Sequence, residues 1–497
     1  MKNRLFLLLL TVLFTNTLSA QELNDFFTKL YEKNLFNGSA AVSKSGKTIL
    51  FSNYGFSNIE KREKITNQSQ FPIASITKTF TATAILQLQQ RGKLNIKEPV
   101  QKYLPDFPYP NITIKQLLSN TSGLAQEYTL FDTIIKEQPE KIISNQDIIP
   151  TFIRFKTQLS FPSGSKWDYN NINFCLAGLI IEKVSGISYA KYLEKNIFKP
   201  AKMKNSFVPL DRKIKSKKQV ELYTYPNFYS TELANTKTVK DPYLISEKSN
   251  FYGNGGIVST ALDLEKYRKA LFSYKILDKK ELDEALTSTK LNDGKTVSYI
   301  IDGKEISYGL GWGMYTDESE GKIVFHDGFI TGMTSILLHN ITKNQGIILL
   351  SNSASSIFPI SNAVLNLIND KPYTIPVQNL SRIYGNLIES GNRQKANELI
   401  QEYLKNPNSY EASERDFNRL GYQFLRLQKC DNALQTFHSA TLIFPKSWNM
   451  YDSYGETLHQ CGKKDEAVKM YQTSIELNPE NENGKQMLLK IEKELGK

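Results

Sequence analysis

Strand-like apolar runs lie near both ends of the first 370 residues, and helical patterns lie between them. Ser39–Ser43 and Thr48–Phe51 flank the turn Lys44–Lys47, which predicts a β-hairpin. Further strand-like runs cover Tyr308–Tyr315, Ile323–Phe325, Thr334–Leu338 and Gly346–Leu350. Helical patterns cover Ser75–Arg91 and Phe174–Val184. This order predicts an α+β fold in which the terminal strands close one antiparallel sheet.

The last part of the chain follows a different pattern, because apolar, small and proline positions recur there after 34 residues. The first copy contains Phe417, Leu420, Gly421, Phe424, Ala433, Phe437, Ala440 and Pro445. The second copy contains Tyr451, Tyr454, Gly455, Leu458, Ala467, Tyr471, Ser474 and Pro479. This period resembles the tetratricopeptide repeat, which implies stacked helix pairs. A degenerate copy is expected over Leu380–Pro407, and a capping helix over Asn483–Leu495.

These patterns divide the chain into an α+β domain over 21–370, a linker over 371–378 and an all-α solenoid over 379–497. The two clear repeats cover about 414–447 and 448–481. Residues 1–20 read as a signal peptide with Lys2 and Arg4 before an apolar run that is too short to span a bilayer. We therefore expect an exported protein of the periplasm or the extracellular space, without a membrane-spanning segment.

Composition and charge fit this expectation. Hydrophobic residues make up 40% of the chain, which is typical of a globular protein. The formal net charge is +12, and an exported chain meets little nucleic acid, so no nucleic-acid partner is expected. The chain has three cysteines. Cys175 lies in an apolar helical run, whereas Cys430 and Cys461 fall near the ends of neighbouring helices, and whether they are bonded stays open.

The most informative motif is Ser75-Ile76-Thr77-Lys78, at the start of a predicted helix. A serine and a lysine three residues apart share one helix face, so the amine can reach the hydroxyl. The spacing is not specific, because Ser163–Lys166 and Ser188–Lys191 match it too. A serine at this position can also serve only as a helix cap.

Two further motifs strengthen the assignment. Tyr169-Asn170-Asn171 follows a turn-rich segment and precedes a helix, and we expect a nearby lysine to favour ionisation of Tyr169. His326-Asp327-Gly328 lies in a predicted strand, where a glycine indicates close approach of another group.

Taken in order, these three motifs resemble those of the penicillin-recognising serine hydrolases, within the class C β-lactamase and D-alanyl-D-alanine carboxypeptidase group. Leu117–Leu124 and Gly255–Thr260 resemble further segments common in that group. The resemblance covers roughly Asn34 to Ser353 and implies a β-lactamase/transpeptidase-like domain, with an antiparallel sheet flanked by helices and a helical subdomain.

The resemblance also implies roles for individual residues. Ser75 would be the nucleophile, with Lys78 and Tyr169 sharing the work of general base. Asn171, His326 and Gly328 would bind substrate. The backbone N–H groups of Ser75 and Phe329 would form the oxyanion hole.

The third motif departs from the Lys-Thr-Gly of most β-lactamases, because His326 replaces the fixed positive charge. This favours an esterase or peptidase over a β-lactamase. The first region has two histidines and no His-Glu-x-x-His or Gly-x-Ser-x-Gly motif, so no metal and no cofactor are expected.

The resulting hypothesis is an exported serine hydrolase that acts on an ester, a peptide amide or a β-lactam through a covalent acyl-enzyme, with repeats that bind a protein partner. The alternative is a catalytically weak ligand sensor or a protein-binding scaffold of the cell envelope. The loops over 125–158 and 209–250 are expected to shape the pocket.

Overall fold

The computed structural model describes residues 20–209, 211, 215–239 and 248–496. The predicted signal peptide therefore lies, apart from Ala20, outside the described residues. The described chain divides into two compact units. The first ends at Pro376 and lacks Tyr225–Ala234; the second comprises Tyr225–Ala234 and Val377–Lys497.

The first unit is built on an eight-stranded antiparallel sheet with the order β2-β1-β14-β13-β12-β11-β10-β9. Its strands are β1 (Gly38–Lys44), β2 (Lys47–Tyr54), β9 (Ser298–Ile301), β10 (Lys304–Tyr308), β11 (Gly313–Asp317), β12 (Gly321–Ile330), β13 (Met333–Asn340) and β14 (Gln345–Ser351). Strand β1 pairs with β14, so the first and last strands of the unit meet as the sequence predicts. The predicted strand over Tyr308–Tyr315 is wrong, because the chain turns between β10 and β11 within it.

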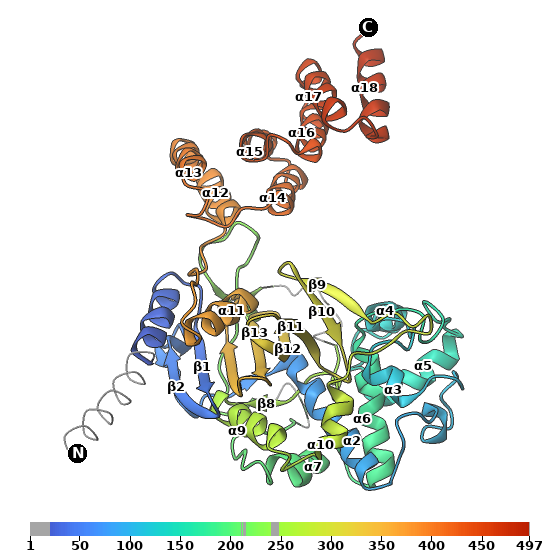
Figure 1. Cartoon of the computed structure of the whole chain (residues 1–497). Helices are drawn as coiled ribbons and strands as arrows, with labels where there is room; N and C mark the ends of the chain where they lie inside the picture. Colours follow the sequence, from blue (N-terminus) through green and yellow to red (C-terminus); the bar gives the residue numbers. More distant parts are fainter. Residues whose placement is uncertain (1–19, 210, 212–214, 240–247, 497) are drawn as a thin grey trace, which may run out of the picture. The chain divides into compact units, whose positions relative to one another are not determined.

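Helices cover both faces of this sheet, and alternate residues along a strand enter two different cores. In β14, Ile347 and Leu349 pack in a core with α11 (Ile357–Ile368) and the helix over 20–32. Ile348 and Leu350 point to the other core, which includes α9 (Ala261–Phe272). Figure 1 shows α9 and α11 against opposite sides of the sheet. Because both faces are buried, the middle of each strand is an unbroken apolar run, over 336–338 in β13 and 347–350 in β14.

The remaining helices of the first unit form a subdomain around the central helix α6. They are α2 (Thr77–Gln90), α3 (Ile114–Leu118), α4 (Glu127–Glu137), α5 (Ile148–Phe155), α6 (Asn171–Ser185), α7 (Tyr189–Leu193) and α10 (Lys279–Ala285). Short helical turns are η1 (Ala74–Ile76), η2 (Val100–Lys102), η3 (Asn145–Asp147), η4 (Glu194–Phe198) and η5 (Thr236–Thr238). Short strand pairs join β3 (Phe56–Asn58) to β4 (Glu63–Lys64), β5 (Phe71–Pro72) to β8 (Val258–Ser259), and β6 (Tyr223–Thr224) to β7 (Ala234–Asn235).

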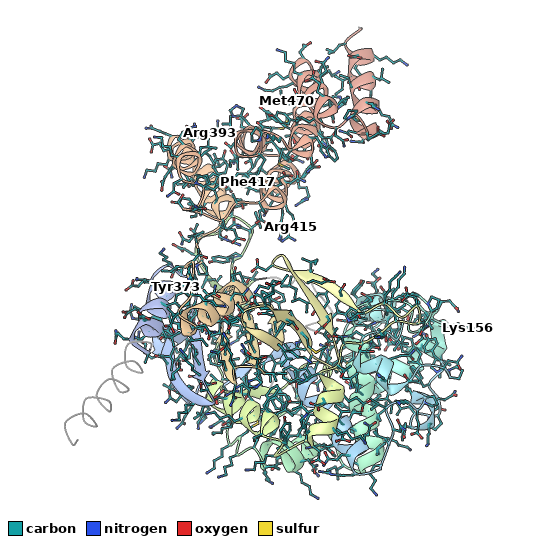
Figure 2. All side chains as sticks on the ribbon, viewed as in Figure 1. Lys156, Tyr373, Arg393, Arg415, Phe417 and Met470 are labelled. Carbon is teal, nitrogen blue, oxygen red and sulfur yellow. A yellow bond between two sulfur atoms is a disulfide. The ribbon has the colours of Figure 1, made fainter. Side chains whose placement is uncertain are left out.

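The second unit consists of helix pairs followed by one more helix. They are α12 (Leu380–Glu389), α13 (Arg393–Lys405), α14 (Glu414–Arg426), α15 (Cys430–Ile443), α16 (Trp448–Gln460), α17 (Lys464–Leu477) and α18 (Glu482–Glu494). Gly421 and Gly455, 34 residues apart, lie at equivalent contacts. A Cβ at Gly421 would lie 2.4 Å from the Phe437 ring, and one at Gly455 would lie 3.0 Å from the Tyr471 ring. Phe417, labelled in Figure 2, is fully buried in this unit.

Cys430 and Cys461 form a disulfide that joins the start of α15 to the end of α16. Across the part of the chain that the structure describes, no single helix has the length and apolar character needed to cross a membrane, although one bent pair beginning with α6 passes on length and composition alone.

Candidate active site

Ser75 lies in the turn η1, immediately before α2, and Lys78 is buried in the first turn of that helix. The Lys78 Nζ atom donates a hydrogen bond of 3.0 Å to the Ser75 Oγ atom. The preceding Ala74 has a φ of 44°, a left-handed conformation that is costly for an alanine and is typical of strained functional turns. By contrast, Ser188 accepts a hydrogen bond from the Lys191 amide and simply caps α7. The structure thus separates a serine–lysine contact from a helix cap with the same spacing.

Three acceptors surround the Lys78 amine. Besides Ser75, it donates to Asn171 Oδ1 at 2.7 Å and to the Asn254 carbonyl at 2.8 Å. A neutral amine keeps two N–H groups and gains a lone pair. With Asn171 and Asn254 holding the two N–H groups, the lone pair points at Ser75. The environment of Lys78 therefore suits both an ammonium group and a neutral amine whose lone pair is aimed at the Ser75 hydroxyl.

A glycine brings the Asn254 carbonyl to this position. Gly253 has a φ of 90°, and a Cβ there would lie 2.2 Å from the Phe174 carbonyl oxygen. Only glycine allows the loop to pack so closely against α6.

The loop that carries Tyr169 and Asn171 is held by Asn120. The Asn120 Oδ1 atom accepts hydrogen bonds from the Asn170 amide at 3.2 Å and from Asn173 Nδ2 at 3.0 Å. The Leu117–Leu124 segment, singled out in the sequence, therefore acts by supporting this loop. Tyr169 shares a side-chain hydrogen bond with Ser75, and its ring centroid lies 4.7 Å from the Lys78 Nζ atom.

The expected ionisation of Tyr169 is not favoured by its surroundings. Burial raises the pKa of Tyr169 well above its ordinary value, and the Asp327 carboxylate raises it further, which outweighs the lowering by the hydrogen bond with Ser75. The phenol therefore stays protonated at neutral pH. It can donate a proton or a hydrogen bond, so of these two side chains Lys78 is the one suited to act as a base.

The third motif lies on β12, which runs beside the turn η1 that holds Ser75. A Cβ at Gly328 would lie 2.6 Å from the Ile73 carbonyl oxygen and 2.4 Å from the Ser335 Oγ atom. Gly328 is thus required because the strand touches the turn that holds Ser75. Phe329, the next residue, lines the same cavity as Ser75, and 63% of its surface is exposed.

His326 is buried beside this cavity and is uncharged. Burial, followed by the nearby charge of Lys78, lowers the pKa of His326 to about 3. The Nδ1 atom lies 2.6 Å from the Asp327 carbonyl oxygen, which can only accept, so Nδ1 carries the proton. The Nε2 atom can then accept from the Tyr308 hydroxyl at 3.4 Å. His326 therefore brings no positive charge to the site.

The cavity at Ser75 measures about 370 Å³ and has mainly aromatic walls. It is lined by Ser75, Trp167, Tyr169, Asn171, Tyr299, Ile301, Tyr308, Gly313, Phe325, His326, Asp327 and Phe329. Trp167 and Tyr299 stack with centroids 4.5 Å apart. Among the described residues, none of this lining comes from 125–158 or 209–250, so the described parts of those loops do not line the cavity as expected. Residues 210, 212–214 and 240–247 of the second loop lie outside the described residues. The walls come from the sheet edge and from the Tyr169 loop.

Comparison with known proteins places this site in a family. The Beta-lactamase family profile matches residues 23–364. The chain belongs to the β-lactamase family. It is 29% identical over 366 residues to Penicillin-binding protein 4* of Bacillus subtilis (strain 168), covering 72% of this chain and 77% of that protein. It is 28% identical over 346 residues to Protein flp of Staphylococcus aureus (strain NCTC 8325 / PS 47), covering 68% of this chain and 64% of that protein.

Solved structures agree with this placement. A penicillin binding protein from Bacillus halodurans superposes with a TM-score of 0.58 at 25% identity, over 69% of this chain and 98% of that one. An octameric penicillin-binding protein homologue from Pyrococcus abyssi also superposes with a TM-score of 0.58, at 26% identity, over 71% of this chain and 77% of that one. The family consists generally of serine hydrolases, and the first unit has its fold.

Two residues of this β-lactamase-family site were not found from the sequence. Asn254 acts through its carbonyl, which every residue type has, so only its position between glycines could have drawn attention to it. Glu127 begins α4, and its Oε1 atom accepts a hydrogen bond of 2.6 Å from Asn171 Nδ2. Its Oε2 atom is buried and has no hydrogen-bond partner among the described residues. Glu127 therefore orients the Asn171 amide so that its oxygen faces Lys78.

The described residues include no group of three or more histidine, cysteine, aspartate or glutamate side chains arranged to hold a metal ion.

Proposed function

We propose that this chain is an exported serine hydrolase that forms a covalent acyl-enzyme at Ser75 with an ester or an amide. The observation that carries the proposal is the hydrogen bond of 3.0 Å between Lys78 Nζ and Ser75 Oγ, together with the two acceptors that hold the other N–H groups of Lys78. A nucleophile with an adjacent, oriented base is the requirement for this chemistry.

The proposed reaction begins when neutral Lys78 takes the Ser75 proton and Oγ attacks the substrate carbonyl. The backbone N–H groups of Ser75 and Phe329 would stabilise the oxyanion. The C–O or C–N bond then breaks, and the leaving group takes up a proton. Because the high pKa of Tyr169 keeps its phenol protonated, Tyr169 suits the task of passing this proton from Lys78 to the leaving group. Water, acting by the reverse route, would release the acyl group.

The charges around the cavity favour an acyl donor without a carboxylate. Lys78 is already occupied by three acceptors, and His326 is neutral. Asp327 and Glu127 bring two carboxyl groups to the site. Among the described residues that line the cavity, none is a lysine or an arginine, so a negatively charged β-lactam would meet no cation there. A neutral or amine-bearing ester or peptide amide would face the two carboxyl groups without like-charge repulsion from the lining. Esters and peptide amides therefore rank above β-lactams as substrates.

We further propose that the second unit is a tetratricopeptide-repeat domain that binds a protein partner, and that the protein works in the periplasm or outside the cell. The 34-residue spacing of Gly421 and Gly455, each against an aromatic ring, supports the repeat assignment. The disulfide between Cys430 and Cys461 supports an oxidising compartment.

The test is hydrolysis of a nitrophenyl ester and of a chromogenic cephalosporin by the mature protein, with Ser75→Ala as the control. We expect ester turnover that is lost in Ser75→Ala, and little cephalosporin turnover. Ester turnover that survives the substitution would refute the role of Ser75. Covalent labelling of Ser75 without turnover would favour the alternative of a ligand sensor.

A further inference from the structure

The segment Tyr225–Ala234 belongs to the second unit, although it lies in the sequence far before the linker. It connects β6 to β7, and the ends of this hairpin are held within the first unit. The Tyr223 amide donates to the Asn352 carbonyl at 3.0 Å, and the Thr236 amide donates to the Leu222 carbonyl at 2.9 Å. The chain therefore enters the second unit twice, once through this hairpin tip and once through the linker.

The hairpin tip is rich in aromatic side chains, and each contacts a helix of the second unit. The Arg382 guanidinium lies 3.7 Å from the Tyr225 ring centroid, and Arg419 lies 4.7 Å from that of Phe228. The Tyr229 ring stacks on Phe424 with centroids 5.2 Å apart. Without α12 and α14, these three rings would be exposed to water, which is costly for large apolar groups.

Backbone recognition accompanies these ring contacts. Arg382 Nη1 donates hydrogen bonds to the Ser230 carbonyl at 2.9 Å and to the Asn227 carbonyl at 3.3 Å. One guanidinium thus binds both an aromatic face and two main-chain carbonyls, as in recognition of an irregular peptide.

A glycine on α12 makes room for the segment. A Cβ at Gly385 would lie 2.7 Å from the Cβ of Tyr229 and 2.7 Å from a methyl group of Leu420. A Cβ at Gly421, on α14, would instead meet the ring of Phe437 on the next helix, α15. Gly385 therefore marks a position where the surface of α12 accommodates the segment.

We propose that α12 and α14 form a receptor surface for an aromatic peptide, and that its ligand is the chain's own segment Tyr225–Ala234. This face of α12 and α14 is then occupied from within the molecule. This proposal does not depend on the chemistry at Ser75. An external peptide of similar composition is expected to bind only after the internal segment has been displaced.

The test uses the full-length chain and a labelled synthetic peptide with the sequence of residues 225–234. A triple variant, Tyr225→Ser with Phe228→Ser and Tyr229→Ser, weakens the internal ligand. We expect this variant to bind the peptide at least about tenfold more tightly than the unmodified chain does. Adding Arg382→Ala to the triple variant should weaken peptide binding by at least about tenfold.

Arg415→Ala is the matched control, because Arg415 lies on α14, is exposed and is labelled in Figure 2. Added to the triple variant, it should leave peptide binding unchanged. Equal peptide binding by the unmodified chain and the triple variant would overturn the proposal, as would peptide binding that is insensitive to Arg382→Ala.

Hydrogen exchange provides a measurement that does not need the triple variant. In the single variant Arg382→Ala, the amides of residues 225–234 should exchange at least about tenfold faster than in the unmodified chain. In Arg415→Ala they should exchange at the unmodified rate. Unchanged exchange in Arg382→Ala would show that the surface does not hold the segment.

Discussion

Replacing Asn171 with aspartate would test the roles assigned to Glu127 and Lys78. The Asn171 Nδ2 atom lies 2.6 Å from Glu127 Oε1, so the substitution brings two carboxyl groups together beside the Lys78 amine. Two carboxylates at such a distance cannot both ionise easily, and they share one proton. While that proton is present, the pair reproduces the native arrangement, with one carboxyl oxygen accepting from Lys78.

The separation between the two carboxyl groups sets the size of their electrostatic repulsion. At an effective dielectric constant of about 20, two charges 2.6 Å apart repel by about 6 kcal/mol. Relaxation of the pair to roughly 5 Å would still leave about 3 kcal/mol. The Lys78 ammonium, which donates to this position at 2.7 Å, favours the ionised carboxyl group and offsets part of that repulsion. We therefore expect the pair to lose its shared proton between the two assay conditions, at roughly pH 5.5 and 9.5.

Loss of the shared proton should impair the proposed catalysis, because the added negative charge stabilises the ammonium form of Lys78 and so removes the proposed base. The assay is kcat/KM for a nitrophenyl ester, expressed as the ratio of Asn171→Asp to the unmodified chain, so that titrations common to both cancel. We expect a ratio within about tenfold of unity at pH 5.5 and at least about tenfold lower at pH 9.5.

The double variant Asn171→Asp with Glu127→Gln is the control, because it removes the repulsion while it keeps an amide beside the new carboxyl group. The ratio of kcat/KM for this double variant to that for the unmodified chain should change between pH 3.5 and 5.5 rather than at higher pH. A ratio for Asn171→Asp that does not vary between pH 5.5 and 9.5 would refute the reasoning about this pair.

Three other substitutions test further parts of the structure. Gly328→Ala places a methyl group 2.6 Å from the Ile73 carbonyl oxygen, so ester kcat/KM should fall at least about 100-fold, and unchanged kinetics would contradict the proposed contact with the nucleophile turn. His339 has its pKa lowered to about 3, chiefly by burial and then by a neighbouring guanidinium, so its contribution to stability is present above pH 6.5 and is lost as the pH falls toward 3. At pH 5 this loss is about 2 kcal/mol, and the urea midpoint of His339→Gln should fall less between pH 7.5 and 5 than that of the unmodified chain; equal falls would be inconsistent with a neutral His339. Trp167→Leu removes the stack with Tyr299, so KM for an aromatic ester should rise about three- to tenfold with little change in kcat, and an unchanged KM would exclude Trp167 from the binding wall.

The sequence predicted the contact between Ser75 and Lys78 better than it predicted the pocket around them. The contact between Ser75 and Lys78 follows from local helix geometry, and the two further motifs were needed to distinguish it from the same spacing at Ser188 and Lys191. The pairing of β1 with β14 was also predictable, because both strands are strongly apolar and terminal.

The pocket could not be predicted because its walls come from strands with weak patterns. Residues Ser298–Ile301 and Lys304–Tyr308 form the sheet edge, and alternation of exposed and half-buried positions there gives little apolar signal. The expected ionisation of Tyr169 failed for a related reason. Proximity to Lys78 can be guessed from sequence, whereas the burial that dominates the pKa of Tyr169 is a property of the assembled site.

The docking of Tyr225–Ala234 into the second unit has a consequence for the order in which the chain matures. This segment is synthesised about two hundred residues before Phe424, which stacks on Tyr229. At roughly 5 to 20 residues per second, its aromatic side chains wait on the order of 10 to 40 seconds for their binding surface. A chain cut at the linker would never cover them. Truncation after Pro376 is therefore expected to produce an aggregation-prone hydrolase rather than a clean catalytic fragment.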